Sequence, residues 1–284
     1  MSIEHEVVAI RLGHVDRPAR DNFLTDPHLT APMRLDFDMW VVRGGDRVIV
    51  VDTGFSRAAG ERRGRVLERR PADALRECGI EPDEVTDVVL THLHYDHAGN
   101  LGDFPDARVL IQQDEVAYAT GGSMRHPQLS HFFDVDDVCD VVRRTFDGRV
   151  DHLAGAHVLH DGVELHPVGG HTPGLQVVRV RTERGWVVLA SDALHYYANL
   201  ELRNPFPAVV DVPAMFTAFD TVVALADGPD HIVPGHDPAV MDRYGPVSDD
   251  LPDGMVALHR TPVTLDPFTD NTVTGAPAVP ARSR

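Results

Sequence analysis

The sequence of 284 residues contains no lysine, only two cysteines and no apolar run long enough to cross a membrane. Without lysine, Schiff-base chemistry and a Walker-type phosphate loop are excluded. Cys78 and Cys139 are far apart and flanked by helix-like sequence, so we expect free, buried thiols and no disulfide. Residues 1–10 lack the basic start and long apolar core of a signal peptide, which favours a cytoplasmic location and no membrane partner.

Basic residues are outnumbered by acidic ones, 26 against 44, which gives a formal net charge of −18. A surface this acidic repels phosphate backbones, so a nucleic-acid partner is not expected. Hydrophobic residues make up 43% and charged residues 25%, values typical of globular proteins. We expect one domain over residues 1–260 and a weakly ordered tail rich in Pro, Thr and Ala over residues 261–284.

Short apolar segments separated by turn residues predict two β-rich halves, each with helices. Strands and hairpins are expected at residues 5–14, 37–54, 86–92, 107–112, 157–168, 175–193 and 230–237. Residues 16–36 contain three prolines and are expected to form a loop. Residues 58–80 are expected to be helical with an interruption at Pro71, their arginines and glutamates forming a solvated face. Residues 211–227 predict a helix with Asp211 as N-cap. The halves suggest two face-to-face sheets with helices outside.

The segment THLHYDHAGN, residues 91–100, places His92, His94, Asp96 and His97 within six consecutive positions directly after an apolar strand. In an extended segment, side chains two residues apart point the same way, so His92 and His94 can bind one ion. Asp96 and His97 follow the strand end, where the chain turns, and can face a neighbouring ion. Imidazole and carboxylate groups are the ligands that zinc and similar divalent metals prefer.

Three further residues of ligand type follow apolar strands: His171 in VGGHTPG, Asp192 in VVLASDA and His236 in HIVPGHD. Side chains at the ends of rigid strands are well placed to converge on one site. The alternative is a scatter of side chains in a chain that has 17 histidines. The spacing of the first four and the shared strand-end position of the others favour a metal site.

These motifs, together with DTG at residues 52–54, resemble the metallo-β-lactamase superfamily of hydrolases over roughly residues 7–236. The resemblance implies an αββα sandwich of two mixed β-sheets with helices on the outer faces and metals at one edge. It implies that the first metal is bound by His92, His94 and His171, the second by Asp96, His97 and His236, and that Asp192 bridges them. It gives Asp52 a supporting role beside the ligand loop.

Within that superfamily, the sequence is most similar to the quorum-quenching N-acyl homoserine lactonases, through HLHYDHAGN, GGHTPGLQ and SDALHYY. Aspartate at position 192, where antibiotic-cleaving members often have cysteine, disfavours β-lactam cleavage. Leu175 stands where the lactoylglutathione thioesterases usually have histidine. Well-known lactonases have a tyrosine three residues after the bridging aspartate, whereas this chain has His195, which can donate to an oxyanion or protonate an alkoxide.

The resulting hypothesis is hydrolysis of lactones or related carboxylic esters by attack of a metal-bridging hydroxide. Asp96 would pass the proton to the leaving alkoxide, and His195 would assist. The metals are expected to be two zinc ions, with manganese, iron or cobalt compatible with the same ligands. A channel for an acyl chain is expected from the apolar residues Phe23, Met33, Phe132, Phe133, Phe206 and Met215.

Two alternatives stay open: a thioesterase or other metallo-hydrolase of a biosynthetic or catabolic pathway, and a metal-binding module without catalysis. The complete ligand set disfavours the second. The resemblance also leaves open a homodimer contact through residues 16–36.

Overall fold

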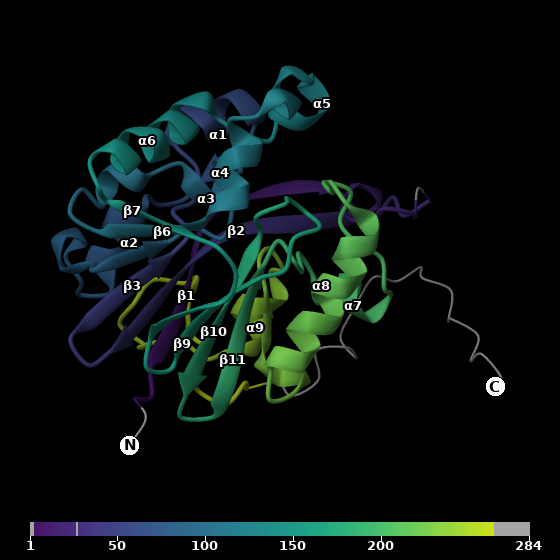
Figure 1. Ribbon diagram of the computed structural model, residues 1–284. Helices are drawn as coiled ribbons and strands as arrows, with labels where there is room; N and C mark the ends of the chain where they lie inside the picture. The colour runs from purple at the N-terminus through teal and green to yellow at the C-terminus, as the bar shows by residue number, and fades with distance from the viewer. Residues whose placement is uncertain (1–2, 27, 264–284) are drawn as a thin grey trace.

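A computed structural model describes residues 3–26 and 28–263, and within them the strands form two mixed β-sheets (Figure 1). The first sheet has the order β13-β1-β2-β3-β5-β6-β7, with β4 beside β1, and the second has the order β12-β11-β10-β9-β8. The first sheet contains β1 (Glu6–Pro18), β2 (Pro32–Gly44), β3 (Arg47–Val51), β4 (Val66–Leu67), β5 (Asp87–Val89), β6 (Arg108–Gln112), β7 (Val150–Leu153) and β13 (Met255–Ala257). The second contains β8 (His157–His160), β9 (Val163–Pro167), β10 (Gln176–Thr182), β11 (Gly185–Ser191) and β12 (Ile232–Pro234).

Alternating side chains on the strands create the layers. On β2, Trp40 and Val42 pack between the sheets, whereas Met39 and Val41 face the helices on the outer side. The helices are α1 (Arg57–Arg63), α2 (Pro71–Glu77), α3 (Tyr95–Ala98), α4 (Gln113–Ala119), α5 (Pro127–Ser130), α6 (Val135–Phe146), α7 (Tyr197–Glu201), α8 (Val212–Leu225) and α9 (Ala239–Arg243). In Figure 1, α2 and α6 lie against the first sheet and α8 lies beside β11 of the second. The predicted αββα sandwich of two mixed sheets is confirmed.

The strands extend further into residues 16–36 than the sequence predicted. β1 and β2 pair antiparallel as far as Pro18 and Pro32, so the connecting segment is residues 19–31. The predicted loop is too long at both ends because proline is tolerated at a strand end, where its missing N–H is not needed by the ladder.

The helical segment at residues 58–80 also differs from the prediction. Helix α1 ends at Gly64, which adopts a left-handed conformation with φ of 66°. Strand β4 follows, and Pro71 then begins α2. Asp211 caps α8 as predicted, accepting a hydrogen bond from the Ala214 N–H. Cys78 and Cys139 are free, as expected, but they are half-buried and not buried.

No helix in the described ranges combines the length and apolar character that a membrane crossing requires. From residue 264 onward, the predicted tail lies outside the described residues, and its extent stays a prediction.

Four strands end at one edge of the sandwich. β11 and β12 are parallel, and β9 runs in the same direction as β11 because both are antiparallel to β10. The carboxyl ends of all three therefore share an edge of the second sheet. β5 of the first sheet leads into His92 at the same edge of the molecule, as the contact between His92 and the residue after β11 shows. This shared edge positions the candidate site.

Candidate metal centre

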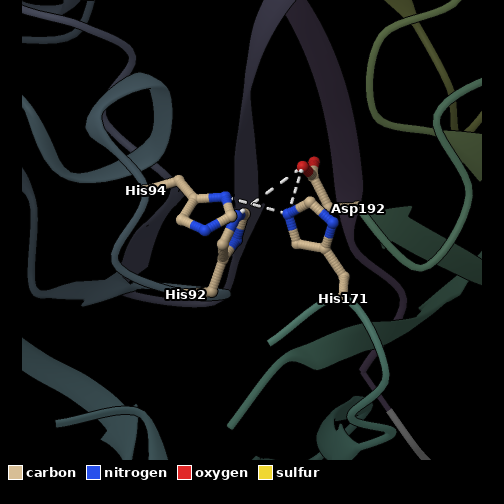
Figure 2. Close-up of side chains that lie close together, drawn as sticks. All are labelled: His92, His94, His171 and Asp192. Atoms are coloured by element: carbon tan, nitrogen blue, oxygen red, sulfur yellow. Dashed lines mark hydrogen bonds and ion pairs between the residues drawn. The ribbon is translucent and has the colours of Figure 1, made fainter. Parts of the chain in front are cut away.

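The structure brings all seven predicted ligands together, in two groups. His92, His94 and His171 form the first group with Asp192, and their ligand-type atoms all lie within 4.8 Å of one another. Figure 2 shows the three imidazole rings and the carboxylate pointing toward a common centre. The second group, defined by the same 4.8 Å limit, consists of Asp96, His97 and His236. Six of the seven side chains are buried, and Asp96 is partly exposed.

Asp192 lies between the two groups. Its Oδ2 is 3.0 Å from His171 Nε2 and 3.6 Å from His92 Nε2, and its Oδ1 is 3.1 Å from His97 Nε2 and 2.9 Å from His236 Nε2. Burial opposes ionisation of this carboxyl, but the surrounding imidazoles outweigh burial and hold the pKa of Asp192 well below its usual range. The side chain is therefore a carboxylate that faces both groups at once.

The protonation states of His92 and His94 suit divalent metal ions. Burial, reinforced by neighbouring histidines, lowers the pKa of His92 and of His94 well below the usual value, so both rings are neutral at neutral pH. A neutral imidazole is the form that binds a metal. His92 Nε2 and His97 Nε2 are buried and form no hydrogen bond with any residue in the described ranges. Buried nitrogens normally have a partner, so these atoms fit a cation held between the rings.

Asp52 supports the histidine loop without facing the centre. Its carboxylate accepts hydrogen bonds from the Thr91 N–H, the Thr91 hydroxyl and His97 Nδ1, each at 2.8 Å. Because His97 donates to Asp52 through Nδ1, its Nε2 faces Asp192 and the centre. Burial opposes ionisation of this ring, but the carboxylates of Asp192 and Asp52 outweigh burial and hold the pKa of His97 well above its usual value, so a metal ion would displace a proton from Nε2. The supporting role that the resemblance implied for Asp52 matches these contacts.

Glu115 is a supporting residue that the sequence analysis missed. This buried carboxylate, on α4, accepts hydrogen bonds from the Leu93 N–H at 3.0 Å and the Gly174 N–H at 3.1 Å. It thereby joins the loop of His92 and His94 to the loop of His171. Gly174 allows this approach, because a Cβ there would lie 2.2 Å from the Glu115 nitrogen. No motif around Glu115 distinguishes it from an ordinary helix residue, so only the fold reveals the role.

His195 lies at the same centre. Its Nε2 is 3.1 Å from Asp192 Oδ2, and its ring stacks on Phe206 with 3.7 Å between centroids. Burial lowers the pKa of His195 to about 3, so the ring is neutral at neutral pH. The ring is also part of a third ligand-type cluster, with Asp192 and His236.

A cavity of about 80 Å³ opens onto the centre, lined by both metal-type side chains and apolar rings. Of the apolar residues predicted to form an acyl channel, Phe132 and Phe206 line this cavity, and Phe132 and Phe133 line an adjoining hollow of about 180 Å³. Phe23 and Met33 pack in the neighbouring apolar cluster, and Met215, on α8, packs with side chains of the second sheet. The predicted channel is therefore only partly formed by the expected residues.

The prediction that the arginines of residues 58–80 form a solvated face is wrong for Arg63 and Arg65. Arg63 and Arg65 are half-buried and line the cavity beside Tyr95. The reason is the left-handed turn at Gly64, which ends α1 and sends the chain into β4 beside β1. The helical periodicity on which the prediction rested stops at that turn.

Comparisons with known proteins agree with this fold. The chain is 27% identical over 203 residues to an N-acyl homoserine lactonase of a Bacillus species, covering 66% of this chain and 76% of the relative. It is 28% identical over 199 residues to a probable metallo-hydrolase of Mycobacterium tuberculosis, covering 60% of each chain. A solved quorum-quenching N-acyl homoserine lactone lactonase superposes with a TM-score of 0.70 at 24% identity, covering 84% of this chain and 94% of that one, which supports the fold.

The sequence pattern of one family matches most of the chain. That family is the metallo-beta-lactamase superfamily, and the match extends over residues 38–242. The matched range contains the histidine loop, His171, Asp192 and His236, and therefore every side chain of the two groups. With the fold, the cluster and this match in agreement, the protein belongs to the metallo-beta-lactamase superfamily of hydrolases.

Proposed function

We propose that the protein is a dinuclear metal hydrolase that opens lactones or cleaves related carboxylic esters. The observation that carries the proposal is the position of Asp192, whose two carboxylate oxygens face one ligand group each. The relatives named as lactonases make this substrate class the first choice. His92, His94 and His171 would hold one ion, Asp96, His97 and His236 the other, and Asp192 both. Zinc is the expected metal because the set is rich in nitrogen, and manganese, iron and cobalt suit the same ligands.

Two divalent ions bound there would make water acidic enough to ionise near neutral pH and would polarise the ester carbonyl. The chain itself performs the remaining tasks. Asp96 is the partly exposed carboxylate that lines the cavity, so it is placed to carry a proton to the leaving alkoxide. Asp52 fixes the orientation of His97, and the aromatic rings of Phe132 and Phe206 exclude water beside the reacting ester.

A screen of metal-loaded protein against lactones, aryl esters and thioesters tests this proposal. We expect kcat/KM to be highest for lactones or other oxygen esters. A preference for glutathione thioesters would favour the thioesterase alternative, and absence of hydrolysis in all three classes would refute an ester hydrolase. A homodimer and a cytoplasmic location stay predictions.

The substitution His195→Ala tests the role of that ring. Because His195 contacts Asp192 and lines the cavity, we expect kcat to fall by about 100- to 1,000-fold, as for loss of one acid–base or oxyanion group. Metal content should stay near that of the wild type, because seven other side chains form the ligand set. Unchanged kinetics on the best substrate would reduce His195 to a packing residue.

The matched control for this variant is His259→Ala. His259 is also buried, but it hydrogen-bonds the backbone of Val7, away from the cavity. Its replacement should lower stability without lowering kcat.

A further inference from the structure

Three arginines line one wall of the cavity above the metal-type cluster. Arg17 comes from the end of β1, Arg63 from the last turn of α1, and Arg65 from the residue before β4. The same cavity is lined by the metal-type side chains His94, Asp96, His171, Asp192, His195 and His236. Guanidinium groups from three separate elements therefore share a space with the groups proposed to act on the ester.

None of these guanidinium groups has a carboxylate oxygen within 4.0 Å among residues 3–26 and 28–263. This contrasts with Arg11 and Arg34 on the same sheet, which pair with Asp36 and Glu68. In a chain with 44 acidic and 26 basic residues, an arginine cluster without an acidic partner is unexpected. Such a cluster is costly to assemble unless an anion completes it.

The contacts that the three arginines do make use only part of their donor capacity. Arg65 donates from Nε to the Tyr95 hydroxyl at 3.0 Å, and the Arg63 guanidinium lies over the Tyr95 ring at 4.0 Å. Arg63 also donates to the carbonyl of Phe133, but its Nε is buried without a partner in the described part of the chain. Arg17 donates to the carbonyl of Asp21 and lies over Phe206, the ring that stacks on His195. Each guanidinium has five N–H donors, so several stay free for a ligand.

The aromatic contacts also fix the guanidinium planes. Tyr95 holds Arg63 by its face and Arg65 by its hydroxyl, and Phe206 holds Arg17. Arginines held in this way lose little side-chain freedom on binding, which favours recognition of a carboxylate or phosphate by paired N–H groups. Burial lowers the pKa of Arg17, and the nearby Asp21 carboxylate does not offset this effect.

We infer that the substrate is a compact ester or lactone that carries an anionic group, a carboxylate or a phosphate, bound by Arg17, Arg63 and Arg65 while its carbonyl faces the Asp192 cluster. This inference rests on the proposed function and specifies its substrate class. The cavity of about 80 Å³, even with the adjoining hollow of about 180 Å³, is smaller than the roughly 300–1,000 Å³ of sites for drug-sized ligands, in keeping with a compact substrate. A neutral substrate would leave the arginines without a counterion.

The test compares three γ-butyrolactones with metal-reconstituted protein. The first carries a carboxylate on the ring, the second carries the matched primary amide, and the third carries a phosphomethyl group. We expect kcat/KM for an anionic lactone to exceed that for the amide by about 10- to 100-fold, the range that follows from one or two charge-assisted hydrogen bonds. The better of the two anionic lactones identifies the group as carboxylate or phosphate.

Two variants are tested, Arg63→Gln in α1 and Arg17→Gln in β1. Because the two residues lie in different elements, one variant still tests the inference if the other does not fold. In each, we expect the ratio of kcat/KM for the anionic lactone to that for the amide to fall by about 10-fold. The control is Arg57→Gln, at an exposed position in the first turn of α1 outside the cavity, which should leave the ratio unchanged. Equal kcat/KM for all three lactones in the wild type, or a ratio that neither variant changes, would overturn the inference.

A binding measurement separates this inference from the proposed function. Calorimetric titration with 5-oxoproline, the lactam counterpart of the carboxylate lactone, is expected to show binding that Arg63→Gln weakens, whereas 5-oxoprolinamide binds weakly to both proteins. If no lactone or ester is hydrolysed but this pattern holds, the ester hydrolase proposal fails and the anion site stands. If lactones are hydrolysed without regard to charge and 5-oxoproline does not bind, the anion site fails and the hydrolase proposal stands.

Discussion

The variant Asp192→Asn is expected to lose more than about 100-fold of its ester hydrolysis and to retain less than the full complement of metal. Loss of a residue that only orients a ligand costs about 10- to 100-fold in metal affinity or activity, and a side chain facing both ion positions should cost at least as much. Asparagine has nearly the same shape as aspartate, so packing is preserved and the change isolates the charge. The measurements are metal content per chain and kcat/KM on the best ester.

The physical reason is the position of Asp192 among five imidazoles, all within 3.6 Å of its oxygens. These imidazoles cannot hold two dications without a negative charge between them, because like charges repel strongly in a site shielded from water. Asp96 supplies a second carboxylate, but only to the group of His97 and His236. Asparagine offers one neutral oxygen and removes the charge shared by both groups.

Asp87→Asn is the matched control. Asp87 is also a buried aspartate, but it begins β5 at the opposite end from the histidine loop and interacts with Arg47, Arg108 and His160. We expect this variant to lose stability while its metal content and kcat/KM stay close to those of the wild type. If Asp192→Asn kept full metal content and turnover, a bridging role for Asp192 would be refuted.

The site could be predicted from the sequence because its ligands follow apolar strands. His171, Asp192 and His236 each come after a buried strand, and strand direction brings the ends of β9, β11 and β12 to one edge. The histidine loop carries four ligand-type residues, and local backbone geometry alone predicts that two of them, His92 and His94, point the same way. Residue type and position after a strand predicted that these side chains converge, and the resemblance to the superfamily supplied their division between two metals.

Other features could not be predicted because they depend on tertiary contacts. Glu115 joins two ligand loops through backbone N–H groups, and such contacts leave no pattern in the sequence. Arg63 and Arg65 belong to a segment whose composition is typical of a solvated helix, yet the turn at Gly64 brings them to the cavity. Arg17, from the distant end of β1, lines the same cavity, and no feature of the sequence indicates that these three arginines meet.

Two bound cations are central to the proposed hydrolysis, and a metal titration of the chelated protein tests their role most directly. Removal of metal with a chelator should reduce hydrolysis to background, since no serine or cysteine nucleophile has been identified to replace it. Each bound ion should also stabilise the folded chain, by about 2.7 kcal/mol when its concentration is 100 times its Kd. We predict that activity returns as Zn²⁺ is added and stops rising at two equivalents per chain. Full activity in protein shown to contain no metal, or saturation at a single equivalent, would contradict a dinuclear centre.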